Sequence, residues 1–419
     1  MKDREKTMVN KRPLRVKILG YAFLIVGLPL LFFALTELVI RVAGINTEVV
    51  KSDRFEVGVP LWAMDPANLA VARDVYRQVL DNALPVDSVE WLNHFEEAPY
   101  VHYRMKPKFS GYVTNTVNRR ELEKGIKVYW ESNSLGYRTG EIPRRKDPSS
   151  FRIFFLGDST TFGWGVDQDE RFTEILGARL NADQNTVSYE IYNFGIPGYT
   201  THHARMLYDH VIRRLQPDMI VYTFGANDSR MVPADIKKML RQSAFIEGLK
   251  DMMGRFRTYR LLRKMVFSLY DPFEKVRKHS VAEGGGEEEA FVTLWEYQQN
   301  LEYLIRSGEK NGVETVLLAL CCPLDYLSKM SAVGGREGVP AVDGMHILLQ
   351  ELPCIQAGEC YTELAAYYRD LYGSELLENR RLLYVTSDTC HPNRLGHRIL
   401  AEAIFTRLFE ERLSVPPAY

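Results

Sequence analysis

The sequence has almost no excess of charge of either sign. Its 419 residues carry 53 Lys and Arg against 54 Asp and Glu, which gives a formal net charge of -1. Proteins that bind the phosphate backbone of nucleic acids usually present a basic surface, so this balance disfavours nucleic acid as a partner. The apolar share of 46%, with 26% charged residues, is instead typical of a globular protein with a sizeable core.

Cysteine is scarce, and its spacing excludes the common zinc sites. The five cysteines form no CxxC pair and no Cys/His spacing typical of a zinc ligand set. The scattered histidines show no ligand spacing either; they are His202, His203, His210, His346 and His397. The sequence therefore predicts no metal and no cofactor.

The amino terminus departs from the average composition. A basic tail over residues 1–17 precedes the uncharged apolar run Ile18–Thr36. About twenty apolar residues suffice to cross the hydrocarbon core of a bilayer as a helix, and the basic flank is expected to stay cytoplasmic. A cleaved signal peptide is the alternative, but it usually has a shorter apolar core and a small-x-small cleavage site, which residues 34–37 lack. We therefore expect an uncleaved transmembrane anchor over 18–42.

Residues 45–150 are predicted to form a small α+β decoration next to the membrane. Helical periodicity runs over 68–81, and the stretch 100–138 is rich in aromatic residues, Val, Thr and Gly, which favours short strands. Proline, charge and serine cluster over 141–150, as in a linker or turn. The role of this region stays open.

From Phe151 onwards, strand and helix patterns alternate. Buried strands are expected at 151–156, 187–195, 218–225, 313–320 and 382–387, with helical segments between them and a closing helix at 393–413. This alternation predicts a parallel sheet covered by helices on both faces. In such sheets, functional groups collect beyond the carboxyl ends of the strands.

Four strand ends carry complementary chemical groups. They are Gly-Asp-Ser at 157–159, Asn-Phe-Gly-Ile-Pro-Gly at 193–198, Gly-Ala-Asn-Asp at 225–228 and Asp-Thr-Cys-His-Pro at 388–392. Acyl transfer needs a nucleophilic hydroxyl, a base, a group that orients the base, and donors for the oxyanion. All four parts are present, in chain order.

On these blocks the sequence resembles the SGNH hydrolases, the GDSL-type lipases and acylhydrolases, over roughly residues 151–412. The matching segments read GDSTTFG, NFGIPGYT, FGAND and DTCHPNRLGH. The resemblance implies an α/β fold, a flavodoxin-like three-layer α/β/α sandwich with a five-stranded parallel sheet of order 2-1-3-4-5. It also implies Ser159 as nucleophile, His391 as base, Asp388 as its partner, and an oxyanion hole from Ser159, Gly198 and Asn227.

Several neighbouring residues have two interpretations. Gly198 is chosen as the oxyanion donor because the family's donor glycine lies five residues past the asparagine, which leaves Gly195 as a tight-turn glycine. Asp158 is expected to hydrogen-bond the loop around Ser159. The pair at 202–203 either opens the following helix, which we favour, or lines an acyl pocket, and Trp164 is either a substrate platform or a packing residue.

A long insertion over 231–289 separates the third strand from the next helix. Residues 241–270 mix Arg and Lys with Met, Phe and Leu at roughly helical spacing, and GGGEEE follows at 284–289. The segment is interpreted as a lid over the site, as a basic amphipathic face resting on an anionic membrane, or as an ordinary helical pair with a solvated basic face.

The cysteines suggest two disulfides. Cys321 and Cys322 end the fourth strand, next to the loop that contains Cys390. We hypothesise a bond between Cys390 and one of that pair, which would clamp the loop of Asp388 and His391, and a second bond between Cys354 and Cys360. Buried reduced thiols are the alternative.

The sequence thus predicts a membrane-anchored serine esterase or acylhydrolase that cleaves carboxylic ester bonds of cell-envelope glycans or lipids. An acyltransferase with the same acyl-enzyme chemistry and a non-catalytic envelope-binding module are the alternatives. Asn227-Asp228-Ser229 is also a glycosylation sequon, and a glycan there would block the oxyanion hole. This favours a single-pass protein of the bacterial inner membrane with its catalytic domain in the periplasm.

Overall fold

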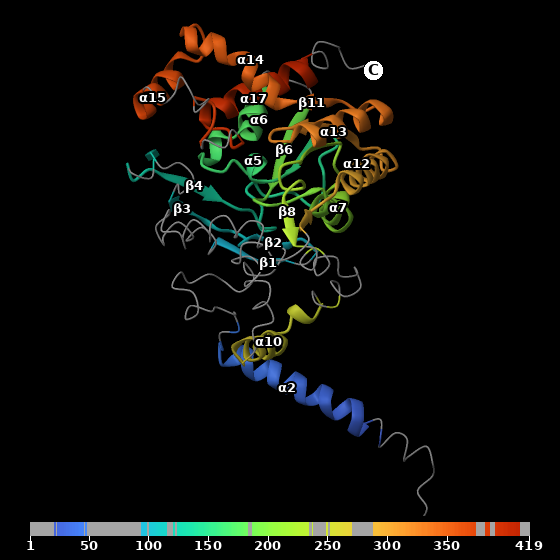
Figure 1. Cartoon of the computed structure of the whole chain (residues 1–419). Helices are drawn as coiled ribbons and strands as arrows, with labels where there is room; N and C mark the ends of the chain where they lie inside the picture. The colour runs from blue at the N-terminus through green and yellow to red at the C-terminus, as the bar shows by residue number, and fades with distance from the viewer. Residues whose placement is uncertain are drawn as a thin grey trace, which may run out of the picture. The chain divides into compact units, whose positions relative to one another are not determined.

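A computed structural model describes residues 21, 23–45, 47, 94–98, 100–114, 120–121, 124–182, 187–233, 237, 249, 252–269, 288–373, 382–385 and 390–410. The chain divides into two compact units (Figure 1). The smaller contains residues 1–50 and 249–272, and the larger contains residues 51–248 and 273–419.

The larger unit is built on a five-stranded sheet in which every strand pair is parallel. Its strands are β5 (Ser150–Gly157), β6 (Ser188–Gly195), β7 (Met219–Thr223), β10 (Glu314–Ala319) and β11 (Ala341–Asp343). They lie in the order β11-β10-β7-β5-β6. Numbered along the chain, this is the predicted order 2-1-3-4-5 read from the other edge, so the fold prediction is confirmed.

The fifth strand is not where the sequence predicts it. The edge position is taken by β11, whereas the described part of the predicted strand, Leu382–Val385, forms a turn with one isolated bridge from Tyr384 to Pro392. Leu382, Leu383 and Tyr384 are nonetheless buried in the core cluster under the sheet. A short apolar run in the sequence indicates that the segment is buried. It does not distinguish a buried turn from a buried strand, because both have the same apolar composition.

Helices cover both faces of the sheet, as predicted (Figure 1). One face packs against α6 (Phe172–Leu180), α14 (Gly344–Ala357), α15 (Thr362–Tyr372) and α17 (Arg394–Leu408). The other packs against α7 (Thr201–His210), α12 (Leu294–Glu309) and α13 (Leu324–Glu337).

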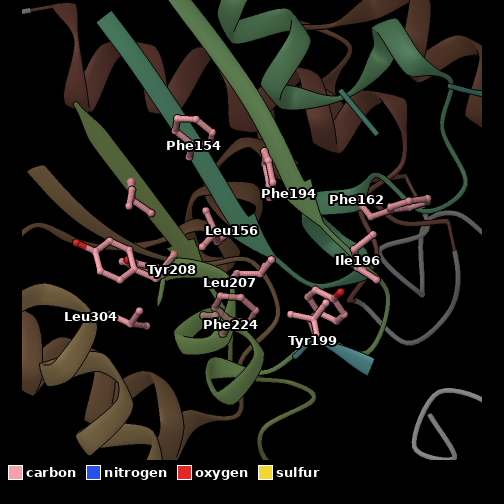
Figure 2. Packing of buried hydrophobic residues seen from close by; sticks show 14 of the residues in the cluster. Phe154, Leu156, Phe162, Phe194, Ile196, Tyr199, Leu207, Tyr208, Phe224 and Leu304 are labelled. Atoms are coloured by element: carbon pink, nitrogen blue, oxygen red, sulfur yellow. The ribbon is translucent and has the colours of Figure 1, made fainter. Parts of the chain in front are cut away.

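The central strand β5 supplies side chains to both layers because successive residues of a strand point to opposite faces. Ile153 and Phe155 belong to the cluster under α6 and α17, and Phe154 and Leu156 belong to the opposite cluster. Figure 2 shows Phe154 and Leu156 among the aromatic and aliphatic side chains of that second cluster. All four are fully buried, which explains the uninterrupted apolar run in the sequence.

Two antiparallel hairpins from the predicted decoration pack on this domain. β1 (Phe95–Ala98) pairs with β2 (His102–Met105), and β3 (Ser110–Thr114) pairs with β4 (Lys127–Glu131). Their buried residues share one core cluster with the sheet; these include Phe95, Tyr103, Met105, Val128 and Trp130. The short strands expected here are confirmed, while the helix expected at 68–81 lies outside the described residues.

The smaller unit contains η1 (Phe23–Gly27), α2 (Leu28–Val42) and α10 (Arg257–Leu269). Among the described residues, the continuous helix Phe23–Val42 is long and apolar enough to cross a membrane. A signal sequence near the amino terminus can meet the same criteria of length and composition, so the anchor stays a prediction.

Candidate active site

The sharp turn after β5 exposes Ser159. The strand ends at Gly157, and the short helix α5 (Ser159–Phe162) begins after one intervening residue. Asp158 caps this helix: its Oδ1 accepts hydrogen bonds from the Thr160 backbone N–H at 2.9 Å and from the Thr160 hydroxyl at 2.7 Å. Asp158 therefore stabilises the loop around Ser159, as predicted.

Ser159 meets His391 across 232 positions of sequence. The serine Oγ lies 2.8 Å from His391 Nε2, within hydrogen-bonding distance. The loop around His391 is fixed by backbone bonds from Val385 N–H to His391 O and from Asn393 N–H to Leu383 O. Asn393 also caps α17 through Gly396 N–H. Buried packing of residues 382–385 thus holds the histidine beside the serine.

Asp388, the predicted partner of His391, lies outside the described residues. Its role therefore stays a prediction.

Asn227 joins three of the four sequence blocks. Its side-chain amide donates to Asp158 Oδ2 at 3.1 Å and to the Tyr199 carbonyl at 3.3 Å. Tyr199 directly follows Gly198, so the amide, the Gly198 backbone and the Ser159 turn lie in one neighbourhood. The structure brings together Ser159, Gly198, Asn227 and His391.

Glycine is needed at positions 195 and 198 of the second block for two different structural reasons. Gly198 has a φ of +83°, a left-handed conformation that favours glycine. Gly195 ends β6 without a positive φ, so the expectation of a tight-turn glycine is wrong. A Cβ at position 195 would instead collide with the backbone of Thr161 and Phe162, and glycine allows β6 to approach α5.

Two buried polar residues fasten the neighbouring loops to α7. Asp228 Oδ1 accepts from the backbone N–H of Thr201 at 2.9 Å and from its hydroxyl, and burial raises the pKa of Asp228 to about 7. His203 Nδ1 accepts from Thr200 N–H at 3.1 Å, and burial lowers the pKa of His203. The favoured interpretation, that His202-His203 opens the helix, is confirmed.

Burial is also the main influence on Asp158. Its side chain is fully enclosed, and this desolvation raises the pKa of the carboxyl. Hydrogen bonds from Thr160 and the electrostatic influence of the nearby His391 and Arg230 side chains act in the opposite direction.

Tyr103 of β2 supports the loop that contains Gly198. Its hydroxyl donates to the Pro197 carbonyl, and the Tyr199 hydroxyl donates back to the Tyr103 carbonyl. All three lie in buried surroundings, where burial raises the pKa of both phenols. No motif in the sequence indicates this pair; only the aromatic richness of 100–138 points to the region.

Arg138 supports the turn on the other side of Ser159. Its buried guanidinium donates to the carbonyls of Gly163, Tyr129 and Val166, each at 2.8 Å, and to that of Phe162 at 3.1 Å. Trp164 packs at the edge of the same core, 6.2 Å from the rings of Trp130 and Phe162. Its packing interpretation is confirmed, and a role as substrate platform stays a prediction.

Both hypothesised disulfides are present. Cys390 is bonded to Cys321, with Cα atoms 5.0 Å apart, and Cys354 is bonded to Cys360. Cys322 is a buried free thiol. The first bond ties the end of β10 to the residue before His391, as the clamp hypothesis requires.

A polar cavity of about 480 Å³ lies at the opposite, amino end of the strands. Lys146, Arg213 and Asp218 line it together with residues of the loops before β7 and β10. None of the predicted site residues is among its lining residues. Within the described ranges, no cluster of three His, Cys, Asp or Glu side chains is arranged to hold a metal ion.

Comparison with known proteins finds one family match and several similar solved structures. Residues 155–289 match the GDSL-like Lipase/Acylhydrolase family. Similar solved structures include the psychrotrophic esterase EstA from Pseudoalteromonas sp., with 15% identity, 63% of this chain and 99% of that chain covered, and a TM-score of 0.36. Another is a lipase/acylhydrolase from Enterococcus faecalis, with 16% identity, coverage of 64% and 100%, and a TM-score of 0.34. No curated protein sequence matches the chain. Residues 155–289 of this chain therefore contain a GDSL-like lipase/acylhydrolase domain.

Proposed function

We propose that this chain is a membrane-anchored serine esterase that cleaves carboxylic O-acyl esters. Ser159 is the nucleophile, His391 the general base and Asp388 the group that orients the imidazole. The 2.8 Å contact between Ser159 Oγ and His391 Nε2 carries the proposal, because it joins residues that only the fold brings together.

The reaction proceeds in two halves. His391 Nε2 takes the Ser159 proton while Oγ attacks the acyl carbon, and the imidazolium returns that proton to the leaving alcohol. Water then loses a proton to Nε2 and attacks the acyl-enzyme carbon. As the bond from that carbon to Oγ breaks, the imidazolium returns the proton to Oγ, which releases the acid and restores Ser159. Asp388 accepts a hydrogen bond from Nδ1–H and stabilises the transient imidazolium.

The oxyanion is stabilised by the backbone N–H groups of Ser159 and Gly198 and by the Asn227 amide. The Asn227 amide is held in place by Asp158 at 3.1 Å, whereas its contact with the Tyr199 carbonyl is longer, at 3.3 Å. We assign the hydrogen that faces Tyr199 to the oxyanion. Burial keeps water from competing for these donors, since Asp158 and Asn227 are both buried.

The substrate class and location follow from the rest of the chain. The basic tail and apolar run support a single-pass protein of the bacterial inner membrane whose catalytic domain faces the periplasm. The two disulfides favour an oxidising compartment. We therefore propose acyl esters of cell-envelope glycans or lipids as substrates.

Activity-based labelling tests this proposal. Full-length protein in detergent is treated with a fluorophosphonate probe and assayed for hydrolysis of p-nitrophenyl acetate. We expect labelling and hydrolysis in the wild type and neither in Ser159→Ala. Ser229→Ala is the matched control, because its hydroxyl donates to the nearby Ala226 carbonyl in the turn after β7 and has no part in the proposed mechanism.

Three outcomes separate the alternatives. A folded wild-type protein that is neither labelled nor hydrolytic contradicts the proposal and favours a binding module. Labelling in which added sugars divert the acyl group from water to a sugar hydroxyl favours an acyltransferase. Labelling with hydrolysis that is insensitive to sugars supports the esterase.

A further inference from the structure

The insertion after Asn227 contains a helix that is bound to the apolar amino-terminal helix. Glu37 of α2 accepts hydrogen bonds from the backbone N–H groups of Arg257 at 3.0 Å and Thr258 at 2.7 Å, and from the Thr258 hydroxyl at 2.9 Å. The first N–H groups of a helix have no partner within it, and a carboxylate there also interacts favourably with the helix dipole. Glu37 therefore caps α10 from 220 residues away.

Further contacts surround this cap. Arg41 Nε donates to Glu37 at 2.7 Å, and its Nη2 lies 3.4 Å from the Arg255 carbonyl. The ring of Phe33 meets that of Phe256 edge-on, with centroids 5.4 Å apart. Figure 1 shows α10 beside α2, and both helices belong to the same compact unit. The start of α10 is thus held by polar and aromatic contacts.

The cap lies near the carboxyl end of α2, where the uncharged run of the sequence stops. Glu37 directly follows the uncharged run Ile18–Thr36. A carboxylate near a bilayer is costly unless it is partnered, and the cap with Arg41 supplies those partners. If α2 spans a membrane, the start of α10 therefore lies at its outer boundary.

The two sides of α10 differ in chemistry. Leu262, Met265 and Val266 are spaced to share one face of a helix, and they are 54%, 53% and 56% exposed. The same spacing places three basic residues on the opposite face; they are Arg257, Arg260 and Lys264. A helix with one apolar and one basic face is suited to lie in the plane of a membrane surface.

Both helices leave large apolar side chains uncovered beyond their junction. On α2, Phe32 is 72% exposed, and Leu38 and Val39 are exposed as well. Soluble proteins rarely expose clusters of such side chains, and an apolar phase would cover those of both helices. A lipid bilayer fits this pattern because it also offers headgroups to the basic face.

We propose that α10 is an interfacial helix that lies in the outer surface of the membrane crossed by α2. Leu262, Met265 and Val266 enter the boundary between headgroups and acyl chains, and the basic face contacts the headgroups. The insertion after Asn227 is then bound to the membrane surface through Glu37. This inference depends on the membrane anchor in the proposed function and is independent of the ester chemistry.

Site-specific fluorescence tests the depth of α10. Full-length Val266→Cys, Lys264→Cys and Phe32→Cys are labelled with an environment-sensitive thiol dye and reconstituted into phosphatidylcholine vesicles with a minority of phosphatidylglycerol. The wild-type chain, with its buried Cys322, gives the background labelling. Lipids brominated near the headgroup end of the acyl chain quench a dye that enters the bilayer. We expect quenching at positions 32 and 266 to exceed that at position 264 by about twofold or more.

The outcomes separate this inference from the rest of the proposed function. Quenching at 32, with equal and weak quenching at 266 and 264, overturns the interfacial helix and leaves the anchor intact. No quenching at 32 overturns the anchor and this inference with it, while hydrolysis of p-nitrophenyl acetate tests the ester chemistry separately. Glu37→Ala provides a second variant: it should lower the quenching at 266 and leave that at 32 unchanged, and no difference at 266 contradicts the role of the cap.

Discussion

The side-chain amide of Asn227 donates two hydrogen bonds, one from each of its hydrogens. Asp158 holds one hydrogen at 3.1 Å, and the Tyr199 carbonyl takes the other at 3.3 Å. An amide in this position is already oriented before a substrate arrives, which is the condition for effective stabilisation of a developing oxyanion. The buried Asp158 side chain thus orients the proposed oxyanion donor Asn227 and also caps α5, which begins with the proposed nucleophile.

Removal of this donor should slow the chemical step. We expect Asn227→Ala to lower kcat for p-nitrophenyl acetate by about a hundredfold to a thousandfold with a small change in KM, because the interaction forms only in the transition state. Steady-state kinetics of the full-length protein measure the effect, with Ser229→Ala as control. A loss confined to KM would assign Asn227 to substrate binding and contradict the oxyanion role.

His397 makes a separate contribution to stability. It is fully buried on α17, its Nδ1 accepts from Phe172 N–H at 3.3 Å, and its ring stacks on that of Phe172. Burial lowers the pKa of His397 to about 3. The unfolded chain takes up this proton near pH 6.5. The contribution is therefore complete above about pH 6.5 and is lost as the pH falls towards 3, at about 1.4 kcal/mol of unfolding free energy per pH unit.

Thermal unfolding between pH 7 and pH 4 tests this effect. His397→Gln should be less stable than the wild type at pH 7 because it loses the ring packing, yet its melting temperature should fall less steeply with acid. His346→Gln is the control, since His346 is exposed on α14. Equal slopes for wild type and His397→Gln would show that His397 does not stay neutral in the folded protein.

At the scale of elements, the hairpin β1–β2 positions the loop of the second sequence block. The Tyr103 hydroxyl donates to Pro197 O, one residue before Gly198, and Tyr199 donates back to β2. The region before the sheet domain thereby gains a role in the proposed oxyanion hole. Tyr103 is a positioning residue, because it acts through the loop and not on the substrate.

We expect Tyr103→Phe to lower kcat several-fold and to leave KM nearly unchanged. Loss of one buried hydrogen bond costs about 1 kcal/mol, and an unsupported Pro197 carbonyl lets the Gly198 N–H leave its position. Tyr112→Phe on the neighbouring hairpin is the control, since that side chain is 71% exposed. A fall in melting temperature without any change in kcat would contradict the positioning role and show that Tyr103 contributes only to stability.

The elements that the sequence predicts well are those whose burial is continuous. β5, β7 and β10 consist almost entirely of buried residues, and α6 and α12 are among the helical segments predicted between the strands. In contrast, β11 has three residues with the sequence Ala-Val-Asp, too few to produce a recognisable pattern. The turn at 382–385 is apolar because it packs beneath α17, and no local pattern distinguishes it from a strand.

The residues of the candidate site likewise divide into those that the sequence predicts and those that it does not. Ser159 and His391 were predictable because motif residues at strand ends meet at one edge of a parallel sheet. Tyr103 and Arg138 were not, because they act through hydrogen bonds to backbone carbonyls of segments that lie far along the chain, and no motif marks such contacts. The choice of Cys321 over Cys322 depends on which of two adjacent side chains faces the loop of His391, and spacing alone does not determine it.

At the scale of the whole molecule, the bond between Cys321 and Cys390 joins the sheet to the loop that contains His391, the proposed catalytic base. It closes a segment of 69 residues, whereas the bond between Cys354 and Cys360 closes one of 6. In the chain-entropy description, the longer closure stabilises the folded state by about 4 kcal/mol and the shorter by about 2 kcal/mol. Only the longer one holds His391 beside Ser159.

The two disulfides should therefore differ in what their removal does. We expect Cys321→Ser with Cys390→Ser to lower both the melting temperature and the rate of fluorophosphonate labelling, because the His391 loop loses its covalent tie to β10. Replacing both serves to prevent a new bond between Cys390 and the neighbouring Cys322. Cys354→Ser with Cys360→Ser is the matched control, with a smaller loss of melting temperature and unchanged labelling. If both pairs of substitutions leave labelling at the wild-type rate, backbone hydrogen bonds such as that from Val385 N–H to His391 O suffice to position the base, and the clamp has no part in catalysis.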